Sequence, residues 1–227
     1  MVKVFKISYI CLAPREYLMQ NTELDTINWH ELLREIETIF LAVTNDDEPL
    51  QKHTQQVLKN LEYLRDNFEI QQKDPQQQEV NSHYPISYFL DKTVDYVPLI
   101  NVLDQVSELL KWEQGYDRLP GGMKGKFAFC NLLGHNGHMY DDKMVIGVML
   151  LGKDCYYPAH VHDDIQELYV CIGGNLQING AKISQGQTSF ISNSQPHTLK
   201  TGDNPALLLY SWLGSKHVLS ENRMRFV

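Results

Sequence analysis

The segment YYPAHVHDDIQELY carries two histidines, a glutamate and a tyrosine at spacings that could place them around one ligand. In an extended strand, side chains two residues apart point to the same face, so His160 and His162 share a face. Residues 163–166 are turn-forming, and Glu167 and Tyr169 then share a face of the next strand by the same period. We expect the two strands to pair as an antiparallel hairpin that brings the four side chains together.

A third histidine, His197, follows a further apolar run in the segment ISNSQPHTL. Three imidazoles and one carboxylate can ligate a divalent transition metal and leave coordination positions open for water or substrate. We therefore predict a metal site made by His160, His162, Glu167 and His197. The same donor set suits zinc, iron, manganese, cobalt and nickel, so the sequence leaves the identity of the metal open.

The first half of the chain has the apolar periodicity of helices. Apolar side chains recur every three to four residues in 29–44, 49–68 and 95–112, which predicts three helices with one apolar face each. Asn28 is the predicted N-cap of the first of them. Residues 69–82 are rich in glutamine and polar around a proline, which is typical of a solvated linker or long loop.

After Tyr116 the pattern changes to short apolar runs separated by turn residues, among them KFAFCNLLG, KMVIGVMLLG, ELYVCIGG and ALLLYSWLG. Strands at this regular spacing predict a β-barrel or a double-sheet jelly roll. The sequence thus indicates an α+β fold, with a helical N-terminal region over 1–116 and a single β-barrel domain over 117–227. The helices should pack on the barrel within one compact unit, because their apolar faces need a partner.

The composition excludes several classes of partner. The chain of 227 residues has a formal net charge of −8 and a pI of about 5.5, with no stripe of Lys and Arg, which argues against nucleic acid. No apolar run approaches the roughly 20 residues that span a bilayer. The four cysteines form no CxxC pair, and the N-terminal apolar run is too short and interrupted for a signal peptide. We expect a cytoplasmic protein with reduced thiols that binds neither nucleic acid nor membrane.

The spacing around the histidines resembles the first cupin motif. Gly152, the His-x-His pair, four residues, Glu167, six residues and Gly174 follow it closely. The second motif is weaker, since serines stand where proline and glycine are usual, although His197 occupies the expected place. The resemblance implies a cupin barrel, that is, a double-stranded β-helix.

A closer resemblance covers the C-terminal half in detail. The segments GVMLLGKDCYYPAHVH, QELYVCIGG and PHTLKTGDNPALLLYSWLG are similar to the cupin-type dimethylsulfoniopropionate (DMSP) lyases and their wider relatives, which also place a helical part before one β-barrel. This resemblance implies a carbon–sulfur lyase that splits DMSP into dimethyl sulfide and acrylate. It implies that Tyr169 and Tyr157 are the active-site tyrosines, with Tyr169 the better candidate for the base. The expected partner is a small-molecule carboxylate, and a homodimer stays open because cupins often pair.

The substrate is less determined than the metal. A sulfonium or ammonium head group is attracted to aromatic faces, which makes Trp212 and Tyr210 the candidate substrate-binding residues. The turn before Glu167 is one residue longer than is usual in the family, and FAFCN has phenylalanines where relatives often carry tyrosines. Asp163 or Asp164 in that turn could replace Glu167 as the ligand, but a turn aspartate is more often solvated or turn-forming.

Other functions use the same donor set. An iron dioxygenase or a sugar isomerase on a cupin fold needs similar ligands, and a cupin can also bind a small molecule without catalysis. The position of Tyr169 and the YPxHxH context favour the lyase, acting on DMSP or a related β-substituted carboxylate. No helix-turn-helix or basic region accompanies the barrel in the sequence, which lowers the case for a sensor.

Overall fold

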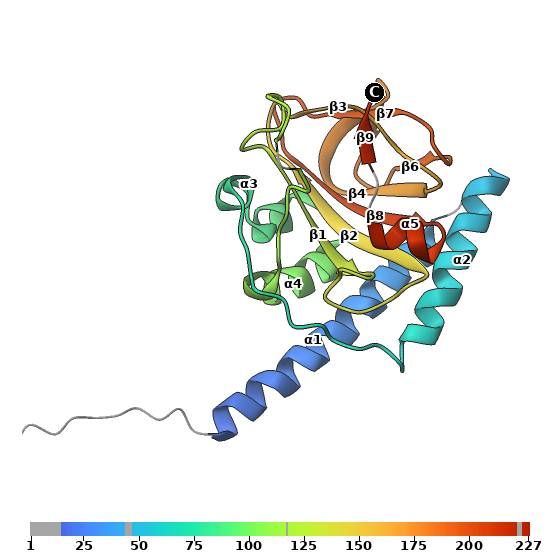
Figure 1. Ribbon diagram of the computed structural model, residues 1–227. Coiled ribbons are helices and arrows are strands. Elements are labelled where there is room, and N and C mark those ends of the chain that lie inside the picture. The colour runs from blue at the N-terminus through green and yellow to red at the C-terminus, as the bar shows by residue number, and fades with distance from the viewer. Residues whose placement is uncertain (1–14, 44–46, 117, 222–223) are drawn as a thin grey trace, which may run out of the picture.

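The computed structural model describes residues 15–43, 47–116, 118–221 and 224–227, with side chains from Asn28 onward. A helical half leads into a curled sheet, so the predicted α+β fold is confirmed (Figure 1). The helices are α1 (Arg15–Ala42), α2 (Glu48–Leu64), α3 (Glu79–His83), α4 (Val97–Gln105) and α5 (Lys216–Glu221), with 3₁₀ turns at Ile86–Lys92 and Ser107–Leu109.

The strands follow in the second half of the chain. They are β1 (Phe127–Leu133), β2 (Met144–Leu151), β3 (Tyr156–His162), β4 (Gln166–Ile178), β5 (Ala181–Ser184), β6 (Thr188–Ile191), β7 (His197–Lys200), β8 (Ala206–Leu213) and β9 (Met224–Phe226). All their pairings are antiparallel, in the order β1-β2-β8-β4-β7-β3-β9, and β5 and β6 also pair with β4. The sheet curls into a roll with two walls. One wall contains β1, β2, β8, β6 and the first part of β4, and the other contains β3, β7, β9, β5 and the end of β4.

The predicted helices are present, but their ends differ from the predictions. Helix α1 begins at Arg15, so Asn28 lies inside the helix and the predicted cap there is wrong. Helix α2 is capped by Asp47, whose Oδ1 accepts a hydrogen bond of 3.1 Å from the Leu50 amide. Its carboxylate satisfies an amide that has no partner within the helix. Helix α4 ends at Gln105, because the chain tightens into a 3₁₀ turn there.

The stretch 69–82 is more ordered than a solvated linker. Ile70 forms a bridge with Met139, and Gln76 forms one with Lys111. Its last residues enter helix α3, where Val80 is buried. The polar composition of this stretch is explained by exposed glutamines, while its backbone pairs with the barrel half of the molecule.

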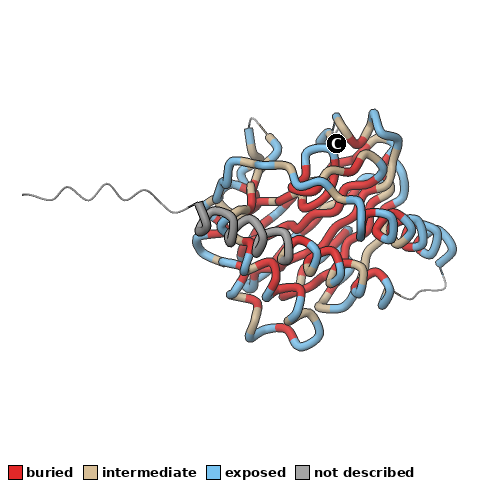
Figure 2. Tube along the Cα trace, turned by 90° about the horizontal axis from the view of Figure 1, so that it is seen from below, coloured by how far each residue is buried: buried red, intermediate tan, exposed pale blue. Residues whose placement is uncertain are grey.

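Strand β8 shows how the sheet separates two cores. Leu207 and Leu209 point to the outer face, where they pack in the same cluster as Ile36 of α1. Tyr210 and Trp212 alternate with them and point into the roll. The tube view shows the resulting continuous buried interior across the strands (Figure 2). The helices thus cover one face of the sheet and leave the concave face for the site.

The expected hairpin between the first two site strands is wrong. Strand β3 pairs with β7 and β9, whereas the first half of β4 pairs with β6 and β8. Residues 163–165 therefore carry the chain from one wall of the roll to the other. The side chains still converge, because both walls turn these faces towards the same interior.

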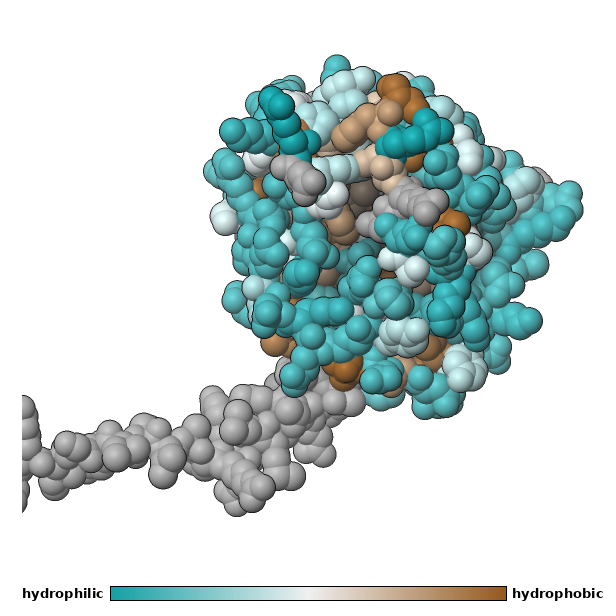
Figure 3. All heavy atoms as spheres, in the orientation of Figure 1, coloured by the Kyte–Doolittle hydropathy of each residue, from teal (hydrophilic) through white to brown (hydrophobic). Residues whose placement is uncertain are grey.

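The outer surface on the side seen in Figure 1 is mostly hydrophilic, and less polar residues gather around a hollow over the roll (Figure 3). No helix in the part of the chain that the structure describes is both long and apolar enough to cross a membrane.

Candidate metal and active site

Three histidines meet inside the roll. His160 and His162 end strand β3, and His197 begins β7, where it lies directly opposite His160. All three are buried, and one nitrogen of each lies within 4.8 Å of the others. Their rings are therefore close enough to contact a single ion.

Backbone carbonyls fix which nitrogen of two rings faces the interior. Nδ1 of His160 lies 3.0 Å from the Pro158 carbonyl oxygen, and Nδ1 of His197 lies 3.2 Å from the Gln195 carbonyl oxygen. A carbonyl only accepts, so each Nδ1 donates its hydrogen and Nε2 is left towards the site. Burial lowers the pKa of His160 to about 3, which keeps this ring neutral.

Glu167 supplies the carboxylate beside the rings. Its Oε2 lies 3.1 Å from His197 Nε2 and 3.7 Å from His162 Nε2. Its Oε1 accepts a hydrogen bond of 2.6 Å from Trp212 Nε1. Burial alone would raise the pKa of Glu167, but the two histidines and the indole lower it to about 2. The carboxylate is thus ionised in the interior of the protein.

Two buried atoms of this cluster fit a bound cation. Nε2 of His160 and Oε2 of Glu167 have no hydrogen-bond partner, although buried polar atoms are nearly always partnered. Both carry lone pairs directed at the shared space. An ion with positive charge would satisfy both, so three imidazoles and one carboxylate fit a divalent metal.

The turn aspartates do not join this cluster. Asp163 pairs with Arg225 at 3.3 Å on the surface, and Asp164 is exposed and has a φ of 58° in the turn. Both therefore have the turn-forming or solvated roles that aspartates usually take between strands. Of the three acids, Glu167 is the one that the fold places beside the histidines.

The two predicted tyrosines lie on either side of the histidines. The Tyr169 hydroxyl is 3.3 Å from His197 Nε2, and the residue is fully buried. The ring of Tyr157 stacks on His160 at 4.0 Å and 8°, and its hydroxyl is hydrogen-bonded to the Tyr116 hydroxyl. The neighbouring Tyr156 does not occupy this inward position, because its side chain is 46% exposed. Burial raises the pKa of both Tyr157 and Tyr169 well above the ordinary value of tyrosine.

A cavity of about 90 Å³ opens beside His162. Aromatic rings and thioethers form most of its wall, contributed by Tyr116, Phe127, Phe129, Met149, Tyr210 and Met224. Tyr157 and Trp212 also line it, whereas Tyr169 is not among the described residues that line it. The site therefore combines one polar side, which carries the candidate metal ligands, with one apolar side.

The polar ends of the two candidate substrate-binding residues are bound to the protein itself. The Tyr210 hydroxyl donates a 2.6 Å hydrogen bond to Asn131 Oδ1, and the Trp212 N–H is bound to Glu167. A Cβ at Gly147 would overlap the Tyr210 ring, so glycine is required there for this approach. Tyr210 and Trp212 thus present ring faces to the cavity. No local pattern predicted the role of Asn131 or the bond between Trp212 and Glu167, because each depends on a strand partner distant in the sequence.

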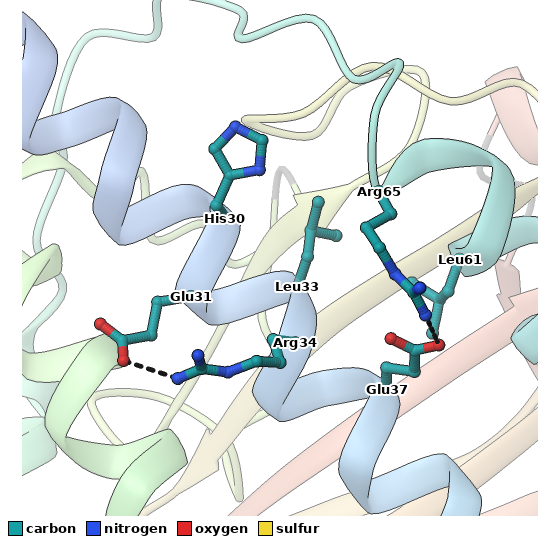
Figure 4. A pocket seen from close by; sticks show the side chains of 7 residues that line it. All are labelled: His30, Glu31, Leu33, Arg34, Glu37, Leu61 and Arg65. Carbon is teal, nitrogen blue, oxygen red and sulfur yellow. Dashed lines mark hydrogen bonds and ion pairs between the residues drawn. The ribbon is translucent and has the colours of Figure 1, made fainter.

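A larger hollow lies on the surface between α1 and α2 (Figure 4). Its charged side chains are paired with one another, Arg34 with Glu31 at 2.7 Å and Arg65 with Glu37 at 2.6 Å. It lacks the unsatisfied buried atoms found at the histidine cluster. Volume alone therefore does not identify it as the functional site.

Comparison with known proteins agrees with the geometry. A profile described as dimethylsulfoniopropionate lyase matches residues 43–208. The chain is 27% identical over 205 residues to a putative DMSP lyase, DddL, of Cereibacter sphaeroides, with 88% of each chain covered. It is 25% identical over 129 residues to the DMSP lyase DddQ of Ruegeria pomeroyi, covering 54% of this chain and 64% of DddQ.

Solved structures support the fold. The crystal structure of DddQ from Ruegeria pomeroyi superposes with a TM-score of 0.69 at 20% identity, covering 88% of this chain and 96% of that one. At this level of identity the likeness establishes the shared architecture of helices followed by a cupin roll.

Proposed function

This chain belongs to the dimethylsulfoniopropionate lyase family, a family of carbon–sulfur lyases, and from that premise we propose that it catalyses β-elimination of DMSP, or of a related β-substituted carboxylate, with a divalent metal held by His160, His162, Glu167 and His197. The observation that carries the proposal is the pair of unpartnered buried atoms, His160 Nε2 and Glu167 Oε2, which face the same space as the other imidazoles.

A metal held by these residues would supply positive charge where the reaction develops negative charge. A divalent zinc, iron, manganese, cobalt or nickel ion bound by these residues would stabilise the charge that builds up next to the substrate carboxylate as its proton is removed. The remaining steps belong to the protein's own side chains. The Pro158 and Gln195 carbonyls and the Trp212 indole orient the ligands before substrate arrives.

Tyr169 is the proposed base. Its hydroxyl lies beside His197, at the edge of the ligand cluster, and an opposite charge there would offset the increase in pKa that burial causes. The phenolate oxygen takes the proton from the carbon next to the carboxylate. The electron pair of that C–H bond forms the C=C bond of acrylate, the C–S bond breaks, and dimethyl sulfide leaves with the bonding electrons.

Tyr157 is proposed to orient the substrate. Its ring is held against His160 and its hydroxyl is held by Tyr116, so it forms a fixed wall of the cavity. The ring faces of Trp212 and Tyr210 would attract the sulfonium, because the face of an aromatic ring carries partial negative charge. The small cavity is consistent with a compact substrate.

The helical region and the barrel are proposed to act as one unit. Helix α2 contacts the strands that carry Glu167, Tyr169 and Trp212, and apolar residues of α1 and α2 pack in one cluster with apolar residues of these strands. Their burial holds these strands in register.

Anaerobic metal replacement tests the reaction class. The purified protein, stripped and reloaded with zinc, manganese, cobalt or nickel, should release acrylate from DMSP without oxygen. A cupin dioxygenase would instead need redox-active iron and oxygen. Activity restricted to iron in air would contradict the proposed elimination.

A further inference from the structure

The last strand lies against the strand that carries two of the histidines. Strand β9 pairs antiparallel with β3, and Met224 lies opposite His162 while Phe226 lies opposite His160. Directly opposite residues of an antiparallel pair share a face of the sheet. The side chains of Met224 and Phe226 therefore lie on the same side as the imidazoles.

Met224 forms part of the cavity wall, and Phe226 packs against two residues of that wall, Tyr116 and Tyr157. Met224 lines the cavity of about 90 Å³ together with His162 and Trp212. The ring of Phe226 lies 5.3 Å from that of Tyr116 and 6.3 Å from that of Tyr157, and it is 40% exposed. Phe226 lines a groove outside the cavity, so Met224 and Phe226 of β9 face two neighbouring spaces.

The side of the cavity formed by β1 and β2 is more deeply buried than the side formed by β9. Phe127 and Met149 lie on the adjacent strands β1 and β2 and are almost completely buried. Strand β9, in contrast, has three residues and pairs along one edge only, among the described strands. Its further ties are a surface ion pair between Arg225 and Asp163 and a 3.0 Å hydrogen bond from the Val227 amide to the Ala159 carbonyl. Strand β9 is thus the part of the cavity wall where a side chain can be changed with little disturbance of the core.

We propose that Met224 and Phe226 are specificity-determining residues that restrict the sulfonium substituents of the substrate to small alkyl groups. The proposal rests on the proposed lyase function, in which the carboxylate faces the histidines and the sulfonium end occupies the apolar side of the cavity. A thioether and an aromatic ring suit this role, because both are polarisable and interact favourably with a soft cation and its methyl groups.

Paired substrates test the proposal. Acrylate release is measured for DMSP and for its diethyl analogue with the metal-loaded wild-type protein and with Met224→Ala, Phe226→Ala and the double variant. The ratio of kcat/KM for the diethyl compound to that for DMSP should rise by about 10-fold or more in Met224→Ala, since a methylene in an apolar pocket has an effect of this order. Met224→Leu, which keeps the volume, should retain the wild-type ratio.

The matched control is Arg225→Gln. Arg225 lies between the two residues on β9 and points to the surface, where its ion pair contributes little. This variant should keep the wild-type ratio, and melting curves establish that each variant is folded. An unchanged ratio in folded Met224→Ala and Phe226→Ala would overturn the proposal.

A binding measurement distinguishes failure of this proposal from failure of the proposed lyase function. Calorimetric titration with the β-trimethylammonio and β-triethylammonio propionates uses the same charges with a poorer leaving group. Tighter binding of the larger compound to Met224→Ala than to wild type would support the specificity role of Met224 even if DMSP is not cleaved. In that case only the lyase proposal would be contradicted. No binding of either compound to the wild-type protein would contradict both.

Discussion

The indole N–H of Trp212 donates a 2.6 Å hydrogen bond to Oε1 of Glu167, and the two residues lie directly opposite each other on strands β8 and β4. The bond occupies one carboxylate oxygen and directs the other to the histidines. We therefore expect Trp212 to act on the proposed metal site through Glu167, in addition to lining the cavity.

Replacing this indole should weaken the metal site. Trp212→Phe keeps an aromatic ring but removes the N–H, so Glu167 loses the bond that orients it. We expect metal affinity to fall by about 10–100-fold, as is typical when the partner of a metal ligand is lost. Competition with a coloured chelator measures the affinity. Trp112→Phe is the control, since Trp112 packs in the helix-side core. Equal affinities of Trp212→Phe and wild type would remove the positioning role.

Loss of histidines should remove the metal and its stabilisation. His160→Ala and His197→Ala each delete one imidazole, and the double variant should retain little metal. Because a ligand that binds only the folded state stabilises it, a chelator should lower the melting temperature of wild type but not of the double variant. Metal analysis beside melting curves tests this. Full occupancy in the double variant would disprove the ligand assignment.

The carboxylate ligand can be distinguished from the turn aspartates. Glu167→Ala should weaken metal binding strongly. Asp163→Ala and Asp164→Ala should leave it unchanged, because both side chains lie at the surface turn. Metal content of the three purified variants decides the matter. A variant that loses metal through an aspartate change, while Glu167→Ala keeps it, would show that the turn supplies the ligand.

The proposed base can be tested by removing a single oxygen. Tyr169→Phe should keep the metal and the fold while kcat falls by about 10²–10⁴-fold, the usual range for a general base. KM should change less, because proton removal belongs to the transition state. Tyr157→Phe should have a milder effect, and exposed Tyr156→Phe should have none. Wild-type kcat in metal-loaded Tyr169→Phe would exclude it as the base.

Local patterns were sufficient to predict part of this structure. The apolar stripes predicted the three main helices, and the alternation after Tyr116 predicted the strands. The start of α1 was misplaced because the helix already runs through Asn28, and an asparagine favours the N-cap only where the chain enters a helix. The hairpin was misassigned because adjacent strands usually pair, whereas β3 and the first part of β4 lie on different walls.

The remaining features depend on contacts between residues far apart in the sequence. The bond between Trp212 and Glu167 requires the pairing of β8 with β4, and the place of Met224 requires the pairing of β9 with β3. Neither pairing has a signal in local periodicity, because each is set by the closure of the whole roll.

Dimethyl sulfide and acrylate released from DMSP by the purified protein test the central claim most directly. Headspace gas analysis and chromatography of the same sample should give the two products in equal amounts from metal-loaded wild type. Removal of the metal with a chelator should abolish both, and adding a divalent transition metal back should restore them. Failure of the folded, metal-loaded protein to produce dimethyl sulfide, or an unchanged rate after the metal is removed, would contradict the account.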